Sequence, residues 1–253
     1  MSRLARSLAN VGLALGVLAG LTLLAAGPGY RFGAWPLGTA FAILRAAAYG
    51  GLAAAVISLA GLILAPFYSR RRGMLRALVG VILGLIVVGL PWSYGRAARA
   101  APPIHDITTD PDDPPAFDAV LPLRVDAANP AAYGGQEVAR LQREAYPDLR
   151  PLVIDLPTDR AFQLALEAAR ALGWRIVASE PQRRRIEASD QTFWFGFVDD
   201  IVVRVTPEGA GSRIDMRSVS RVGKGDTGTN AARIRAYLDR LRAELPAGDG
   251  SVD

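Results

Sequence analysis

The sequence predicts an α-helical membrane region of three transmembrane helices, followed by a soluble α+β domain. Two observations support this fold class. The first 101 residues contain three long apolar runs and no Asp or Glu, whereas all 24 acidic residues come later. The later residues alternate between the helical period of about 3.6 and the strand period of about 2. This division is typical of a membrane protein that carries one soluble domain.

The first apolar run, residues 8–27, is twenty residues long and carries no charge. A helix needs about this length to cross a hydrocarbon core of about 30 Å. A secretory signal peptide is the alternative, because Arg3 and Arg6 precede the run and small residues end it. The run is long for a signal and two more follow, so we expect a span.

The second and third spans follow from the positions of charges and aromatic residues. Only Arg45 interrupts the second run, and a charge at the bilayer centre costs about 2.5–3.5 kcal/mol on insertion scales. We therefore place the second span at about 46–67, with Arg45 at its edge. The third covers about 77–94 and has Pro91 in its last turn. The membrane region is thus residues 1–100.

The arginine residues around the spans predict the orientation. Six flank the first end of the bundle: Arg3, Arg6, Arg70, Arg71, Arg72 and Arg76. Four lie on the other side: Arg31, Arg45, Arg96 and Arg99. Because cytoplasmic loops are enriched in Lys and Arg, we expect a multi-pass protein of the bacterial inner membrane. Its N-terminus would be cytoplasmic and its C-terminal domain periplasmic, with the lipid bilayer as the first partner.

The charge distribution argues against nucleic-acid binding, although the pI is near 9.9. Ten of the 29 basic residues lie in the first 101 positions, which leaves 19 against 24 acidic residues, a net charge of −5, for the remainder. The positive excess lies between apolar segments, where it orients a membrane protein. Without cysteine, the chain has no disulfide, thiolate nucleophile or Cys-based metal site.

The soluble part is predicted to begin with an extended segment. Residues 101–130 hold seven prolines and follow neither period. A short amphipathic helix follows between Gly134 and Tyr146. Residues 101–150 therefore form a Pro-rich extended segment plus this short helix.

Residues 151–246 are predicted to form the α+β domain. A strand at 152–156 precedes a helix that runs from about 158 to Gly173. The remaining elements are strands at 174–179, 184–189, 197–206 and 213–221 and a helix at about 229–245. In the order β-α-β-β-β-β-α, they predict an antiparallel sheet of about five strands, with helices on one face and water on the other.

Four motifs resemble one bacterial family. They are IHDITTDPDDPPAF at 104–117, AYPDLRPL at 145–152, RRIEASDQTFWFGFVDDIVVRV at 184–205 and SRVGKGDTGTNAARI at 220–234. In this order they are similar to the family catalogued as domain of unknown function 1499, over about residues 104–241. The resemblance implies no established activity. The family's lipoprotein-like and membrane-anchored members imply an extracytoplasmic domain.

The only histidine marks a candidate catalytic or metal site. His105 and Asp106 could act as an acid–base pair, or both could hold a metal ion together with Asp110. The alternative is that the aspartates cap turns of the Pro-rich segment. Because no nucleotide-binding, serine-hydrolase or zinc-protease motif occurs, we expect no cofactor.

The segment that leads into the last helix is a candidate anion-binding site. Free backbone N–H groups at a helix N-terminus favour a phosphate or carboxylate. The residues proposed to bind this anion are Ser220, Arg221, Lys224, Asp226, Asn230 and Arg233. The alternative is a Gly-rich turn in which Asp226 or Thr229 caps the helix.

The aromatic residues at 193–197 are the last candidate. Strand alternation would send Phe193, Phe195 and Phe197 to one face and Trp194 to the other. One interpretation is a set of core residues with one exposed ring. The alternative is an aromatic lip that faces lipid or a ligand, with Trp194 in contact with it.

These features favour a non-enzymatic binding or interaction domain that acts in the cell envelope. An anionic small molecule and an envelope protein are the candidate partners. One alternative is an envelope enzyme that uses His105 and neighbouring carboxylates, or a metal held there. Another is a membrane assembly or structural factor.

Overall fold

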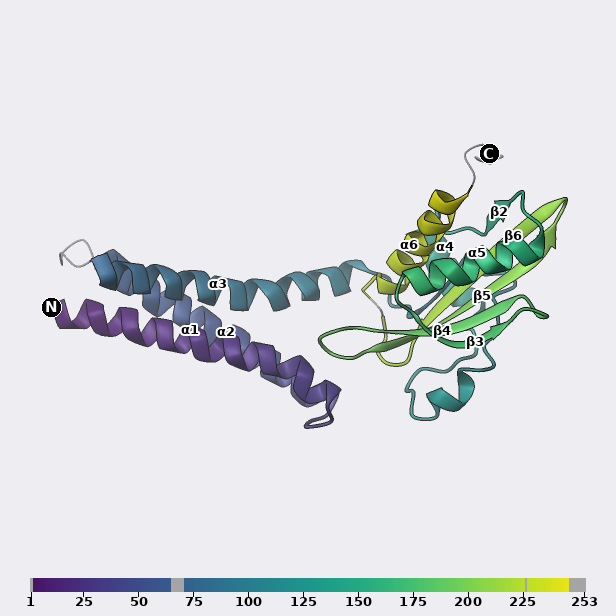
Figure 1. The fold of residues 1–253 in the computed structure, drawn as a ribbon. Helices are drawn as coiled ribbons and strands as arrows, with labels where there is room; N and C mark the ends of the chain where they lie inside the picture. The colour runs from purple at the N-terminus through teal and green to yellow at the C-terminus, as the bar shows by residue number, and fades with distance from the viewer. Residues whose placement is uncertain (1, 65–70, 226, 246–253) are drawn as a thin grey trace. The chain divides into compact units, whose positions relative to one another are not determined.

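The chain consists of two compact units (Figure 1). The first is Met1–Ala97 together with Phe193–Gly196, and the second is Ala98–Thr192 together with Phe197–Asp253. We term them the helical unit and the sheet unit. The computed structural model describes residues 2–64, 71–225 and 227–245.

Three long helices form most of the helical unit: α1 (Ser2–Arg31), α2 (Leu37–Leu64) and α3 (Arg71–Ala100). Each is long and apolar enough to cross a membrane, which confirms the prediction of three such helices. They extend beyond the predicted spans 8–27 and 77–94, and α3 continues through Pro91. The predicted end of the second span, at 67, lies outside the described residues.

Small residues bring the three helices close together. Gly12 of α1, Ser58 of α2 and Gly80 of α3 meet at one level, where a Cβ on either glycine would collide with the Ser58 Oγ. Gly51 and Gly84 make a second close approach between α2 and α3. Such contacts allow van der Waals packing of helices in lipid, where apolar burial gives little driving force between them.

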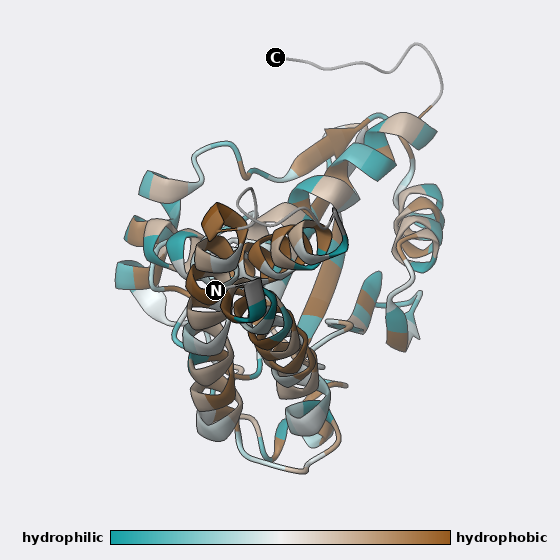
Figure 2. Cartoon of the chain, turned by 90° about the vertical axis from the view of Figure 1, so that its left-hand side faces the viewer, coloured by the Kyte–Doolittle hydropathy of each residue, from teal (hydrophilic) through white to brown (hydrophobic). Residues whose placement is uncertain are grey.

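Contacts along the helices fix their directions. Gly61, near the end of α2, lies against Ala9 near the start of α1, so these two helices are antiparallel. Arg76, near the start of α3, donates to the Asn10 Oδ1 of α1 at 3.0 Å, so α3 runs parallel to α1. Apolar residues, brown in Figure 2, recur along the helices beside the N-terminus.

The sheet unit is built on a six-stranded antiparallel sheet. Its strands lie in the order β1-β6-β5-β4-β3, and β2 pairs with another part of β6. The strands are β1 (Asp106–Thr108), β2 (Leu152–Ile154), β3 (Arg175–Glu180), β4 (Arg185–Gln191), β5 (Val198–Glu208) and β6 (Gly211–Ser220). Five of them match the predicted runs, and β1 is additional. The pairing of β3 with β4 shifts register between Ile176 and Ala178.

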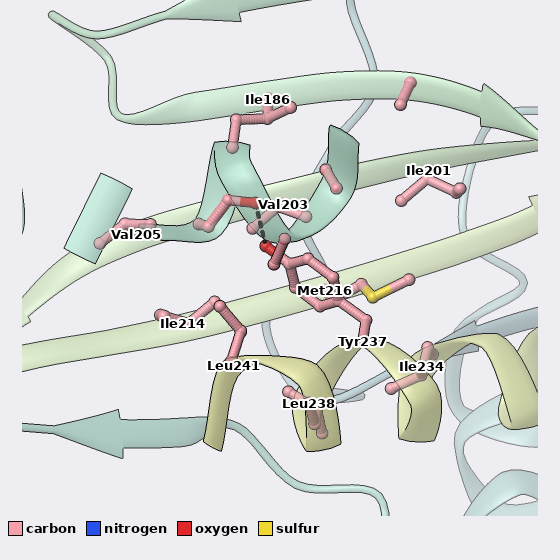
Figure 3. Close-up of a cluster of buried hydrophobic side chains, with 14 of the residues drawn as sticks. Ile186, Ile201, Val203, Val205, Ile214, Met216, Ile234, Tyr237, Leu238 and Leu241 are labelled. Carbon is pink, nitrogen blue, oxygen red and sulfur yellow. Dashed lines mark hydrogen bonds between the residues drawn. The ribbon is translucent and has the colours of Figure 1, made fainter. Parts of the chain in front are cut away.

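Helices cover one face of this sheet (Figure 1): α5 (Thr158–Ala171) and α6 (Thr229–Glu244), the two that the sequence predicts there, and in addition α4 (Gly135–Ala145). Apolar residues from alternate positions of β5 and β6, such as Val203 and Met216, pack with Leu241 of α6 (Figure 3). Tyr237 is fully buried, and its hydroxyl donates to the Ala165 carbonyl of α5 at 2.9 Å. The core therefore joins α5 and α6 to the sheet.

The opposite face of the sheet is also covered, so the prediction that it faces water is wrong. Residues 109–133, which follow β1 and which we term the cover segment, lie over it and include the 3-10 helix η2 (Leu121–Arg124). Phe117 and Val120 of this segment pack on Val202 and Val219 of the sheet. Arg213 of β6 pairs with Asp110 of the cover segment, and Arg217 pairs with Asp106 of the neighbouring strand β1. The covered face is therefore polar in sequence.

Candidate functional site

A layer of ion pairs lies on the face of the sheet that the cover segment covers. The Arg217 guanidinium of β6 donates to both oxygens of Asp106, at 2.8 and 2.7 Å. It also lies 5.0 Å from the Phe117 ring centre and 5.3 Å from that of Tyr133, in cation–π contact. Arg217 is only 2% exposed. A pair so deeply buried is stable only when its hydrogen bonds are satisfied, as they are here.

A second group of ion pairs is centred on Asp200 of β5. Its fully buried carboxylate accepts hydrogen bonds from Arg221 at 2.8 Å, from Ser189 at 2.7 Å and from Arg124. Burial raises the pKa of this carboxyl, but the hydrogen bonds from Arg221 and Ser189 outweigh burial and hold the pKa below its usual value. Asp200 is therefore charged at neutral pH and fixes Arg124 of η2.

Two more carboxylates attach the cover segment to the sheet. Asp110 accepts a hydrogen bond from Arg213 of β6 at 2.6 Å. Its other oxygen accepts the backbone N–H groups two and three residues later, both at 3.1 Å. Glu187 of β4 accepts two backbone N–H groups of the cover segment, both at 2.9 Å. The cover segment is thus held along its length.

The 3-10 helix η2 presents apolar side chains to solvent. Leu121, Leu123 and Val125, which we term the apolar ledge, are 43%, 43% and 81% exposed. Between them, Arg124 points into the ion-pair layer and donates to the Asn129 carbonyl at 3.0 Å. Residues 121–125 thus hold three exposed apolar side chains, whereas ordinary surfaces expose such residues singly.

Three residues of the predicted anion site lie together on the helix-covered side. The Asn230 Nδ2 donates to the Ser220 Oγ at 2.9 Å, and Arg233 donates to the Asn230 Oδ1 at 2.7 Å. Arg233 also pairs with Asp190 at 2.9 Å and with Asp199 at 2.7 Å. Two carboxylates therefore already neutralise the Arg233 guanidinium.

The other residues proposed for that site lie elsewhere. Arg221 is on the opposite face of the sheet, where it binds Asp200. The side chain of Lys224 is exposed, and Asp226 lies outside the described residues. The N-cap of α6 is Gly228. The structure does not bring the predicted cations together around one position.

The residues of the predicted acid–base or metal site also have separate partners. Asp106 and Asp110 form the two ion pairs described above. The backbone carbonyl of His105 accepts hydrogen bonds from the Ser220 N–H at 3.0 Å and from the Asn230 Nδ2 at 3.1 Å. Within the described ranges, no group of three His, Asp or Glu residues is placed to hold a metal ion.

The aromatic residues Phe193–Gly196 belong to the helical unit. They form a turn between β4 and β5 rather than part of a strand, so alternation does not apply to them. Phe193 is 89% exposed, whereas Phe195 is 9% exposed. Trp194 is partly buried and packs beside Leu23 and Val87.

Sequence reasoning missed Arg124, Glu187 and Asp200. In the sequence, each is one charged residue that resembles any solvated surface position. A usable signal was present in the charges of whole segments. An acidic, Pro-rich segment and an arginine-bearing strand in the same domain indicate partners of opposite charge.

Comparison with known proteins agrees with this division of the chain. The family model described as "Protein of unknown function (DUF1499)" matches residues 106–241. This match begins at the first residue of β1 and ends within α6, so it includes the ion-pair layer and the apolar ledge. No curated protein matches the chain.

Proposed function

This chain belongs to the DUF1499 family, and from that premise we propose that it is a bacterial inner-membrane protein with a periplasmic interaction module. The helical unit inserts into the lipid bilayer, and its three apolar helices support this role. The sheet unit is non-enzymatic and binds a protein of the cell envelope.

The helix directions and the arginine residues support the proposed orientation. Because α1 and α3 are parallel, Arg3, Arg6, Arg72 and Arg76 belong to the same end of the helical unit. No acidic residue offsets them in the first 101 positions. The more arginine-rich end stays in the cytoplasm, and an odd number of spans carries the sheet unit to the other side.

One observation carries the interaction role: ion pairs and hydrogen bonds fix the backbone that bears the apolar ledge. Arg124 bonds to the buried Asp200, and Arg221 donates to the Leu123 carbonyl at 2.6 Å. These bonds hold Leu121, Leu123 and Val125 outward, although apolar side chains gain free energy when they are buried. An apolar patch with a polar rim is the usual core of a protein–protein interface.

The ion pairs also support a role without catalysis. Asp106, Asp110, Arg221 and Arg233 are four of the charged groups that chemistry at the predicted sites would use. Each is engaged with a partner of opposite charge within 3.0 Å. A substrate would have to break a bonded and largely buried pair before it could use one of them.

Reporter fusions test the orientation. Alkaline phosphatase and green fluorescent protein would each be fused after residue 245 and, as the matched control, within the connection between α2 and α3. We expect active phosphatase and no fluorescence at the first site, and the reverse at the second. A fluorescent fusion after residue 245 would overturn the periplasmic placement.

Photo-crosslinking in native membranes tests the ledge. A photoreactive amino acid would replace Val125 or, as the control, Val153, which is 58% exposed on β2. We expect an adduct with another protein from position 125 only, and its loss in the Leu123→Glu variant. Equal adducts from both positions, or none from position 125, would contradict the proposed interface.

A further inference from the structure

Pro28 leaves one carbonyl of α1 without its usual partner. In an α-helix each N–H group donates to the carbonyl four residues earlier, and proline has no N–H group. Pro28 lies inside α1, so the Leu24 carbonyl lacks the hydrogen bond from residue 28 that a regular helix would provide. An unsatisfied carbonyl is costly where lipid replaces water.

Trp194 supplies the missing donor. Its indole Nε1 donates to the Leu24 carbonyl oxygen at 3.2 Å. The neighbouring Gly27 provides the space for the ring, because a Cβ at that position would lie 2.8 Å from the indole. Pro28 therefore leaves an acceptor for the Trp194 indole N–H, and Gly27 leaves space for the indole ring.

The residues on either side of Trp194 have partners in the same helices. The Phe195 ring lies 6.1 Å from the Tyr30 ring and 5.9 Å from the Phe41 ring, measured between centroids. Arg31 donates a hydrogen bond to the Phe193 carbonyl. Aromatic contacts and hydrogen bonds therefore fix the segment at three consecutive positions.

We propose that Gly27, Pro28 and the Leu24 carbonyl form a receptor notch for Trp194, and that Phe193–Gly196 is an internal anchor loop of the helical unit. The notch recognises an indole because it needs an N–H donor at the edge of a flat ring. The anchor loop gives Trp194 a role in the packing of the helical unit, in place of contact with an external ligand. This inference is independent of the apolar ledge and its partner.

Chemical cross-linking of the full chain in native membranes tests the anchor loop. Because the chain has no cysteine, the variant Phe32→Cys/Phe193→Cys has only two thiols. Both phenylalanine rings flank the Arg31 guanidinium, at 5.8 and 6.0 Å, and both are exposed. We expect a bifunctional thiol reagent to join them. The control pair Leu78→Cys/Phe193→Cys should give no joined product.

Substitutions in the notch then test recognition. Filling it with Gly27→Leu should lower the cross-linking yield about ten-fold, as expected for overpacking a close contact. The matched change Gly38→Leu should have no effect, because nothing lies within 4 Å of a Cβ at that glycine. Equal yields in the two variants, or no cross-link in the parent pair, would overturn the proposal.

A double-variant comparison separates the hydrogen bond from general packing. Trp194→Phe keeps an aromatic ring but removes the donor, and should lower the yield about five-fold. Pro28→Ala restores an N–H group that can satisfy Leu24 within the helix, so Trp194→Phe should then have little further effect. If Trp194→Phe lowers the yield equally in both backgrounds, the carbonyl freed by Pro28 is not what Trp194 recognises.

Discussion

The helical unit and the sheet unit bury polar atoms in opposite ways. In the helical unit, Gly12, Ser58 and Gly80 let backbones touch, and the buried Ser58 hydroxyl has no hydrogen-bond partner among the described residues. In the sheet unit, whole charges are buried, as in the Arg217–Asp106 pair. Packing in the helical unit depends on small residues at the helix contacts. The stability of the sheet unit depends on a partner for each buried charge.

This difference shows which changes each unit tolerates. A close helix contact is lost when a side chain is added, because the backbones must move apart. A buried ion pair is lost when a side chain is removed, because the remaining charge has no partner and no water. The variants below test each unit at its own weak point, in order of decreasing expected effect.

The largest effect is expected for Arg217→Ala in the sheet unit. The change leaves the Asp106 carboxylate buried and unpaired, which typically costs about 3–5 kcal/mol of the free energy of unfolding. Urea unfolding of the full chain in detergent would measure it. Replacing both partners, Arg217→Met with Asp106→Leu, should recover most of the loss. A single variant as stable as the parent would mean that the pair is not buried as described.

A somewhat smaller effect is expected for Asp200→Asn, and it should depend on pH. The pKa of Asp200 in the folded chain lies below its usual value. The stability from this carboxylate is therefore fully present above the unfolded pKa of about 3.9, and it is lost as the pH falls through the folded pKa.

Unfolding of the parent and of Asp200→Asn would be compared from about pH 6 downward, through the unfolded pKa of about 3.9 and below it. The difference in unfolding free energy should be largest at the upper end and shrink as Asp200 becomes protonated. A difference that stays constant over this range would show that the charge of Asp200 does not stabilise the fold.

In the helical unit, Gly80→Leu should destabilise the bundle by about 1–3 kcal/mol, the usual range for overpacking. Gly89→Leu in the same helix is the control, because nothing lies within 4 Å of a Cβ there. Ser58→Ala should be neutral or slightly stabilising, since it removes a hydroxyl without a partner. Unfolding in detergent would compare the three. Equal losses for both glycine variants would contradict the close contact.

The smallest effect is expected for Arg140→Ala on α4. Arg140 pairs with Glu137 and Glu144, both at 2.7 Å, but all three side chains are more than half exposed. Exposed pairs on a helix contribute little, because water and salt screen them. The urea midpoint should remain within error of the parent value. A clear loss would mean that exposed pairs matter as much as the buried layer does.

Regular patterns in the sequence predicted most of the fold. The apolar runs of α1 to α3, the stripe of α5 that ends at Gly173, and the four alternating strands all follow from local periodicity. Gly173 has a φ of 77°, a left-handed conformation that glycine adopts without strain. Such features depend only on residues that are close in the sequence.

The covered face of the sheet and the anchor loop could not be predicted in this way. The pairing of Arg217 with Asp106 joins residues 111 positions apart, and no local pattern relates them. The candidate sites had the same weakness: Arg221 and Arg233 are near in sequence, yet they pair with Asp200 and Asp199, neighbours in β5 that face opposite sides of the sheet. Charges near in sequence therefore predicted a shared site that the fold divides.

The edge strands of the sheet are poorly suited to pairing with a strand of another chain. One edge consists of two three-residue strands, β1 and β2, and the other, β3, breaks its register between Ile176 and Ala178. Fibrils grow when a long, straight edge strand offers its free N–H and C=O groups to another chain. Copies that accumulate before they reach their destination should therefore remain separate and resist amyloid formation.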